Sequence, residues 1–197
     1  MARDMTPVLK RCRALGIEPA YMGLDKKSKR NLRAGRKPSE YALQLKEKQK
    51  AKFIYGVLEK PFRNNFAKAQ KLKYGTTGEN LMILLEQRLD NVVFRMGYAR
   101  TRKEARQIVG HKHVLVNGKC VNIPSYTVKP GDKIEIKEKV KGYQRYKDVL
   151  ETTEGRLIPD WLEADHETLT GTVKEIPTRE QIDVPVNEVL IVELYSK

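Results

Sequence analysis

The side chains of this sequence that could do chemistry are mostly arginines and lysines, which recur at short intervals over its first three quarters. The densest group is the run Arg100-Thr101-Arg102-Lys103-Glu104-Ala105-Arg106, in which four cations occupy seven residues. Thr101 and Glu104 have the spacing of a capping box, so a helix that begins here would present cations together with free backbone N–H groups. That combination is suited to binding phosphate.

The distribution of charge supports a polyanionic partner. The chain has 197 residues with 39 Lys plus Arg and 25 Asp plus Glu, a formal charge of +14. Residues 1–80 hold 20 basic and 7 acidic side chains (+13), residues 81–147 hold 15 and 6 (+9), and residues 148–197 hold 4 and 12 (−8). We therefore expect the first two parts to face phosphate and the acidic tail to face elsewhere. The alternative is a solvated basic surface without a partner.

The first 37 residues have few apolar side chains and no steady period, but many cations. We expect this basic arm to order on a polyanion, because arginine pairs with phosphate through two parallel hydrogen bonds. A disordered leader that binds nothing is the other interpretation. No apolar segment follows the first charge near the N-terminus, so a secretory signal is not expected, and no apolar run is long enough to span a membrane.

Helical patterns dominate the next part of the chain. Ser39 is placed to cap a helix that begins at Glu40, and Pro61 opens a second helical stretch. Phe62 and Phe66 lie one turn apart in that stretch, which favours a core position over a base-stacking platform. Asn187 is placed to cap a final helix that runs to the end of the chain, although its β-branched residues also fit a strand.

A compact module is predicted between residues 76 and 139. Thr76 to Glu79 form a capping box before an apolar stripe that runs at helical spacing to Met96, and Gly97 stands where a left-handed C-cap is needed. A short helix follows from Thr101 to Gly110. The pair Asn117-Gly118 between β-prone residues predicts a tight hairpin, and residues 133–137 alternate as a half-buried strand.

In this order the motifs resemble a known family. Residues 87–147, with Arg88-Leu89-Asp90-Asn91-Val92-Val93, Arg102-Lys103-Glu104-Ala105-Arg106-Gln107 and Val116-Asn117-Gly118-Lys119, are similar to the S4 RNA-binding domain. The flanks, including residues 44–50, 54–59, 77–81 and the terminal Leu190-Ile191-Val192-Glu193-Leu194-Tyr195-Ser196-Lys197, resemble bacterial small-subunit ribosomal proteins of the S4 family. The resemblance covers essentially the whole chain.

The resemblance implies a structural constituent of the small ribosomal subunit that works in the cytoplasm, in the ribosome. Such a protein is a primary binder of small-subunit ribosomal RNA that helps to nucleate assembly of the subunit body. It contributes to translational accuracy with neighbouring small-subunit ribosomal proteins, and messenger RNA near the entry channel is a further implied partner. No membrane partner is expected. A stand-alone RNA-binding regulator, acting on its own messenger or in transcription, is the alternative, and an RNA-modifying enzyme is a remote one.

We expect an α+β protein with a basic RNA-binding arm at residues 1–37. An all-helical domain at 38–80 is completed by the C-terminal helix at 186–197. Between them, residues 81–185 form an inserted module of helices packed on a small antiparallel β-sheet, with the S4 core at 87–147. Duplex RNA hides its base edges in a deep, narrow groove, so binding should depend on phosphate, sugar and shape. The expected RNA-binding residues are Arg3, Lys10, Arg11, Arg13, Arg36, Lys37, Lys46, Lys50, Arg88, Asn91, Arg95, Arg100, Thr101, Arg102, Lys103, Arg106 and Lys112.

No catalytic residue, cofactor or metal is expected. Many members of the family carry four N-terminal cysteines that bind zinc, starting with a C-x-x-C pair, but here the equivalent positions are Leu9 and Cys12. The only other cysteine is Cys120, and one thiolate cannot make a tetrahedral site, so this is a zinc-free form. His111 and His113 flank a lysine at a predicted helix-to-strand junction, where RNA contact or turn packing is favoured over metal binding. The chain lacks a phosphate-binding loop with a Lys-Ser/Thr ending and a nucleophile motif, so it is not expected to be an enzyme.

Overall fold

The computed structural model describes residues 6–26, 30 and 37–196. The chain divides into two compact units, which we treat separately. Unit 1 is Met1–Met82 with Asp183–Lys197, and unit 2 is Ile83–Ile182. Among the described residues, no helix is both long and apolar enough to cross a membrane.

Unit 1 is helical in its described part. It contains α1 (Val8–Leu15), the short 3-10 helix η1 (Pro19–Met22), α2 (Glu40–Ile54), α3 (Glu59–Lys71), the start of α4 (Thr77–Glu86) and α9 (Glu188–Tyr195). The expected caps are present, since the Ser39 hydroxyl accepts a hydrogen bond from the Ala42 amide and the Asn187 side chain accepts one from the Val189 amide. The C-terminal segment is therefore a helix, as expected.

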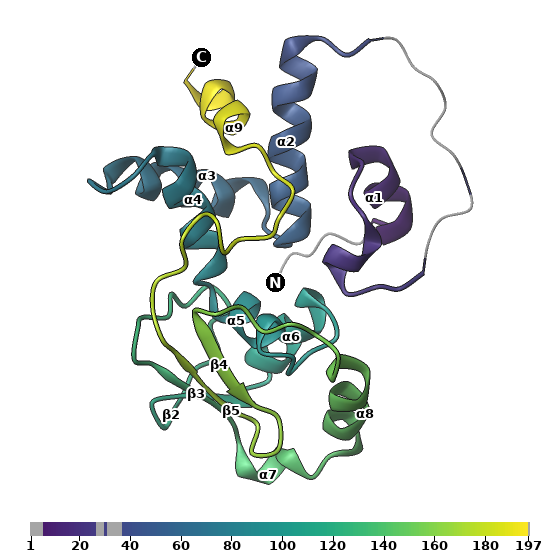
Figure 1. Ribbon diagram of the computed structural model, residues 1–197, viewed down its shortest axis with the longest axis vertical. Helices are drawn as coiled ribbons and strands as arrows, with labels where there is room; N and C mark the ends of the chain where they lie inside the picture. The colour runs from purple at the N-terminus through teal and green to yellow at the C-terminus, as the bar shows by residue number, and fades with distance from the viewer. Residues whose placement is uncertain (1–5, 27–29, 31–36, 197) are drawn as a thin grey trace. The chain divides into compact units, whose positions relative to one another are not determined.

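Helix α9 lies beside α2 and completes the core of unit 1 (Figure 1). Gln44 of α2 donates to the Glu193 carboxylate at 3.0 Å, and the Tyr195 ring packs against Phe66 with centroids 4.5 Å apart. Ile191 and Phe62 are fully buried in the same unit. The two phenylalanines are core residues, as their helical spacing predicted.

Unit 2 combines helices with a five-stranded antiparallel sheet. Its helices are α5 (Leu89–Arg95), α6 (Arg102–Gly110), α7 (Glu138–Lys141) and α8 (Gln144–Thr153). Its strands are β1 (Val114–Val116), β2 (Lys119–Cys120), β3 (Lys133–Ile136), β4 (Leu162–Asp165) and β5 (Thr170–Val173), in the order β2-β1-β3-β5-β4. The α+β class expected from the sequence is confirmed.

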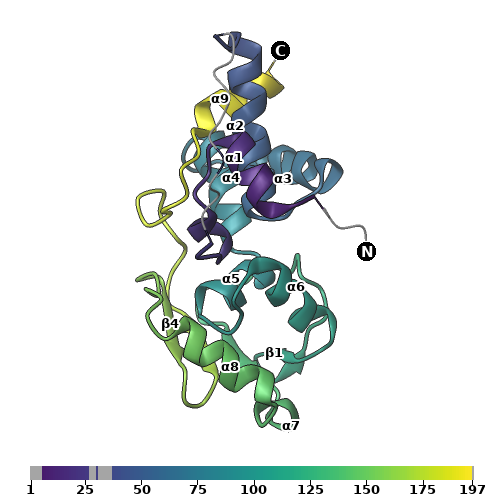
Figure 2. The same cartoon turned by 90° about the vertical axis from the view of Figure 1, so that its right-hand side faces the viewer.

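Figure 2 shows α5 and α6 facing β1 of the sheet, and the buried apolar residues of these helices and of the sheet belong to one core. Val92, Ile108 and Ile134 are fully buried there. The predicted hairpin joins β1 to β2 through Asn117 (φ 50°) and Gly118 (φ 74°), and Val116 pairs with Lys119 across it. Two positive φ angles are what a type I′ turn requires, which explains why Asn-Gly is found here.

The single helix expected up to Met96 is wrong in one respect, because the chain leaves the helical conformation at Arg88. That residue is extended (φ −68°, ψ 136°) and pairs with Thr127 as an isolated β-bridge. The Leu89 amide donates to Tyr126 O at 2.8 Å, so a distant loop takes over the hydrogen bonds of the broken turn. Apolar spacing continues through the break, and the pattern therefore could not reveal it.

Candidate nucleic-acid interface

Helix α6, which carries the densest group of cations, is positioned by its first turn. The Thr101 hydroxyl accepts a hydrogen bond from the Glu104 amide at 3.2 Å, as the capping pattern predicts. Ala105, Ile108 and Val109 are buried in the core. The helix therefore has one fixed apolar face, and its first turn is presented at the surface of unit 2.

Asp90 is the centre of a buried ion-pair network behind this helix. Its carboxylate accepts two hydrogen bonds from Arg88, at 3.0 and 2.8 Å, and two from Arg106, at 2.9 and 2.7 Å. Asp90 is 2 % exposed. Since Arg88 precedes α5 and Arg106 lies on α6, this carboxylate joins the two helices and fixes both guanidinium groups.

A second buried network surrounds Glu86. Arg95 donates to both carboxylate oxygens of Glu86, at 3.2 and 2.8 Å, and Asn91 donates to one of them at 2.6 Å. The side-chain oxygen of Asn91 in turn accepts a hydrogen bond from Arg102 Nε at 2.8 Å. The Arg102 guanidinium lies 4.3 Å from the centre of the Phe94 ring. Both Asn91 and Arg102 are buried. The two networks contain four guanidinium groups and two carboxylates, so their summed formal charge is positive.

Glu104 makes a third, more exposed connection. Its carboxylate accepts hydrogen bonds from Arg100, at 3.2 and 3.3 Å, and from Arg145 of α8, at 3.2 and 3.1 Å. Burial raises the pKa of Glu104, but the hydrogen bonds and positive charge of Arg100 and the charge of Arg145 more than offset this, so the pKa lies below its ordinary value. The carboxylate is thus ionised at neutral pH and holds two arginines at the surface.

The structure separates the expected binding residues of unit 2 into two sets. Arg88, Asn91 and Arg102 are buried, and Arg95, Thr101 and Arg106 are half-buried. The exposed residues of the set are Arg100, Lys103 and Lys112. Lys112 follows α6 in a left-handed conformation (φ 63°), at the junction with β1. Arg100, Lys103 and Lys112 are therefore the expected residues of unit 2 that are exposed to solvent, whereas Arg88, Arg102 and Arg106 hold hydrogen bonds within the two buried networks.

The expected residues of unit 1 also differ in their surroundings. Lys10, Lys37 and Lys46 are exposed. Arg11 donates to the Gln49 side chain at 3.2 Å, Lys50 pairs with Glu47 at 2.6 Å, and Arg13 is half-buried. Arg3 and Arg36 lie outside the described residues.

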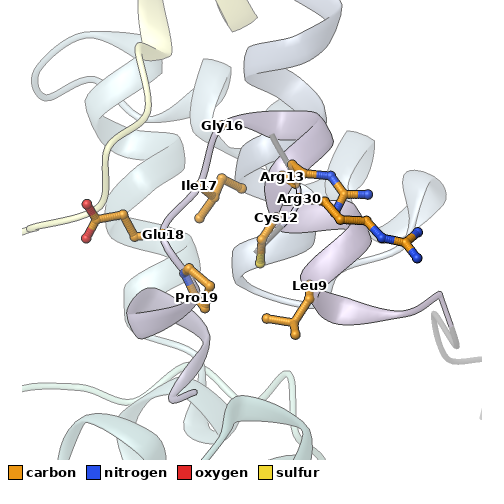
Figure 3. Close-up of a pocket in the computed structure, with 8 residues that line it drawn as sticks. All are labelled: Leu9, Cys12, Arg13, Gly16, Ile17, Glu18, Pro19 and Arg30. Atoms are coloured by element: carbon orange, nitrogen blue, oxygen red, sulfur yellow. The ribbon is translucent and has the colours of Figure 1, made fainter. Parts of the chain in front are cut away.

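A small cavity of about 290 Å³ lies between α1 and η1, where the sequence has Leu9 and Cys12 in place of a cysteine pair. In Figure 3 the Cys12 sulfur points between Leu9 and Pro19, whereas Arg13 and Arg30 extend to one side. Burial raises the pKa of the Cys12 thiol, so the thiol is protonated at neutral pH. Within the part of the chain that the structure describes, no three His, Cys, Asp or Glu side chains are grouped as metal ligands.

Sequence reasoning included residues 137–147 in the S4-like core but named none of them as a binding residue, although this segment, which follows β3, contains five basic and one acidic side chain. Arg145 of this segment contacts Glu104, and Tyr146 contacts His113. The available signal was the alternation of basic and aromatic residues between Lys137 and Lys147.

Comparisons with known proteins find two matching domain models and close relatives of the whole chain. Residues 3–86 match the model of the ribosomal protein S4/S9 N-terminal domain, and residues 87–134 match that of the S4 domain. The chain is 81 % identical to the small ribosomal subunit protein uS4 of Lachnoclostridium phytofermentans over the full length of both. It is 72 % identical to the uS4 protein of Lachnospira eligens and 50 % identical to that of Fusobacterium nucleatum, again over both full lengths.

Proposed function

Because the chain belongs to the family of small ribosomal subunit protein uS4, we propose that it is a structural constituent of this subunit and binds ribosomal RNA. The observation that carries the proposal is the 81 % identity to a uS4 protein over the whole length of both chains. A member of this family is a structural component rather than an enzyme, so the RNA-modifying alternative is wrong. Its place is the ribosome, in the cytoplasm.

Among the expected residues of unit 2, the RNA contacts are assigned to the exposed cations, which are Arg100, Lys103 and Lys112. Exposed lysine and arginine side chains can approach phosphate without first breaking a buried pair, which would leave a carboxylate uncompensated. Arg88, Arg95, Arg102 and Arg106 support this surface from behind, through Asp90, Glu86 and Asn91. They also raise the local positive potential, since four arginines face two carboxylates.

In unit 1 the corresponding contacts are assigned to Lys10, Lys37 and Lys46, together with the arm of residues 1–37. Within this proposal residues 38–80 and 186–197 form the helical domain, and residues 81–185 form the inserted module. Assembly of the subunit body, translational accuracy with neighbouring ribosomal proteins, and contact with messenger RNA near the entry channel are the finer roles that we propose. Their support is the family to which the chain belongs.

The test is sedimentation of a cell extract through a sucrose gradient, with an antibody or an affinity tag that detects this chain. The proposal predicts that the chain sediments with small subunits and whole ribosomes, and that ribonuclease treatment moves it to the top of the gradient. A chain found mainly as free protein before ribonuclease treatment would contradict the proposal. A second arm measures binding of purified chain to small-subunit ribosomal RNA.

A further inference from the structure

A group of aromatic rings lies in unit 2 where the loop after α6 meets the segment after β3, and some of these rings are exposed. The Lys137 amide donates to His113 O at 2.9 Å, which joins the two segments. The ring of His113 lies 6.0 Å from that of His111 and 6.4 Å from that of Tyr143, centroid to centroid, with both pairs edge to face. His111 and His113 directly follow α6 and flank Lys112, whereas Tyr143 comes from the segment after β3, and none of these rings is a member of the buried networks around Asp90 and Glu86.

One ring of the group is anchored and another is accessible. The Tyr146 hydroxyl lies 3.0 Å from His113 Nδ1, and Tyr146 is 1 % exposed. Burial and the charges of His111, Arg145 and Lys137 lower the pKa of His113, so it is neutral at neutral pH and can hold this hydrogen bond. Tyr143, by contrast, is 53 % exposed. The anchored pair therefore supports an aromatic ring of which half remains open to solvent.

The surroundings of this ring are cationic. Lys112, Lys139 and Lys147 are exposed, and Lys137 is half-buried. Two of the acidic side chains nearby are ion-paired, since Glu138 pairs with Lys141 at 2.8 Å and Glu104 pairs with Arg100 and Arg145. An approaching polyanion would thus meet a net positive surface around an exposed aromatic ring.

We propose that His111, His113 and Tyr143, with Lys112, Lys139 and Lys147 around them, form a binding site for unpaired RNA, in which a base stacks on Tyr143 and the lysines contact adjacent phosphates. The inference rests on the proposed function, because it takes RNA as the partner. A duplex keeps its bases stacked inside and offers no base to an exposed ring, whereas a single strand does. The core of a protein–protein interface is depleted of lysine and other charged residues, whereas exposed lysines lie close to Tyr143 in this sequence.

Binding of the full-length protein to a single-stranded oligouridylate that carries one 2-aminopurine tests the site, since the fluorescence of this base is quenched when it stacks. Stacking on one aromatic side chain contributes enough free energy for about a tenfold change in affinity. We therefore expect Tyr143→Ala to weaken binding about tenfold and to abolish quenching, and Tyr143→Phe to behave as the unchanged protein. Tyr74→Ala is the matched control, since Tyr74 is 85 % exposed but belongs to unit 1.

An oligonucleotide of equal length with abasic sites separates stacking from charge. The unchanged protein should bind it about tenfold more weakly than oligouridylate, and Tyr143→Ala should bind both equally. If Tyr143→Ala and the unchanged protein bound oligouridylate with equal affinity, the inference would be overturned. Loss of binding to a protein partner by the same variant would not rescue it. Retained binding to small-subunit ribosomal RNA in that case would leave the proposed function standing.

Reconstituted small subunits identify the source of the strand. If it belongs to ribosomal RNA, Tyr143→Ala exposes unpaired bases to chemical modification in the absence of messenger. If it is messenger, the variant changes only the crosslinking of messenger to this chain. No change in either measurement would overturn the site.

Discussion

Replacement of Asp90 tests whether the buried network organises the surface of unit 2. The Asp90 side chain is 3 % exposed and its two arginine partners are 9 % and 14 % exposed, so all three charges are largely removed from water. Breaking a buried pair by removing one partner costs about 3–5 kcal/mol, because the remaining charge stays buried without compensation. We expect Asp90→Ala to lower the free energy of unfolding by this amount.

Urea unfolding followed by circular dichroism measures the effect, with thermal unfolding as the second assay. A loss of about 3–5 kcal/mol corresponds to a fall in Tm of roughly 6–20 °C for a protein of this size. Glu163→Ala is the matched control. Its partner Lys174 lies 3.7 Å away, the two side chains are 66 % and 53 % exposed, and such a pair contributes about 0–1 kcal/mol.

A double-mutant cycle with Arg106→Ala measures how much of the lost stability comes from the contact between Asp90 and Arg106. Because Asp90 bonds Arg106 directly, the two substitutions should be non-additive by about 1–3 kcal/mol. If Asp90→Ala costs no more than Glu163→Ala, or if the cycle is additive, the reasoning that Asp90 holds α5 and α6 together is refuted.

Three further predictions concern close packing, pH and metal. A Cβ at Gly171 would lie 2.6 Å from the backbone oxygen of Glu163, so Gly171→Ala should destabilise the protein by about 1–3 kcal/mol in urea unfolding. Gly155 has open space around it, and Gly155→Ala is therefore a control that should change the stability very little. Burial raises the pKa of Glu59, but hydrogen bonds from Lys52 and Lys48 outweigh this and lower the pKa to about 2. A lowered folded-state pKa stabilises the protein above the ordinary pKa near 4.5, and this contribution is lost as pH falls toward 2. Glu59→Gln should therefore be less stable than the unchanged protein at pH 7. The difference in the free energy of unfolding should be under about 1 kcal/mol, because the side chain is half exposed, and it should vanish near pH 2. A difference that stays constant with pH would contradict the assignment. Purified protein should contain no stoichiometric zinc by elemental analysis, and one equivalent would contradict the zinc-free assignment.

The sequence predicted helix caps and turns correctly where the residues that determine the conformation are close together in the chain. The capping box at Thr76 and Glu79 is formed reciprocally, with distances of 2.8 and 3.3 Å, and the Asn117-Gly118 turn joins two strands as expected. In each case the residues that decide the conformation lie within four positions of one another. Propensity and hydrogen-bonding pattern are therefore enough to recognise them.

Tertiary contacts explain what the sequence did not reveal. Arg88 interrupts the expected helix because residues 124–128 supply its hydrogen bonds from another part of the chain. The burial of Arg102 depends on its hydrogen bond to Asn91, which lies on α5. From composition alone, both residues are expected at the polar surface. Strands β4 and β5 extend the sheet at β3 through backbone pairing between segments that are distant in sequence. The division of arginines into buried and exposed sets was thus beyond pattern analysis, and the individual RNA contacts remain predictions.

The salt dependence of binding to small-subunit ribosomal RNA tests the central claim most directly. Each cation that no longer neutralises a phosphate should reduce the slope of the logarithm of the binding constant against the logarithm of salt concentration by about one. Replacing Arg100, Lys103 and Lys112 together by alanine should reduce that slope by about 2–3, while Lys174→Ala, an exposed cation of the acidic tail, should leave it unchanged. A triple variant with the slope of the unchanged protein would contradict the assignment of RNA binding to these exposed cations.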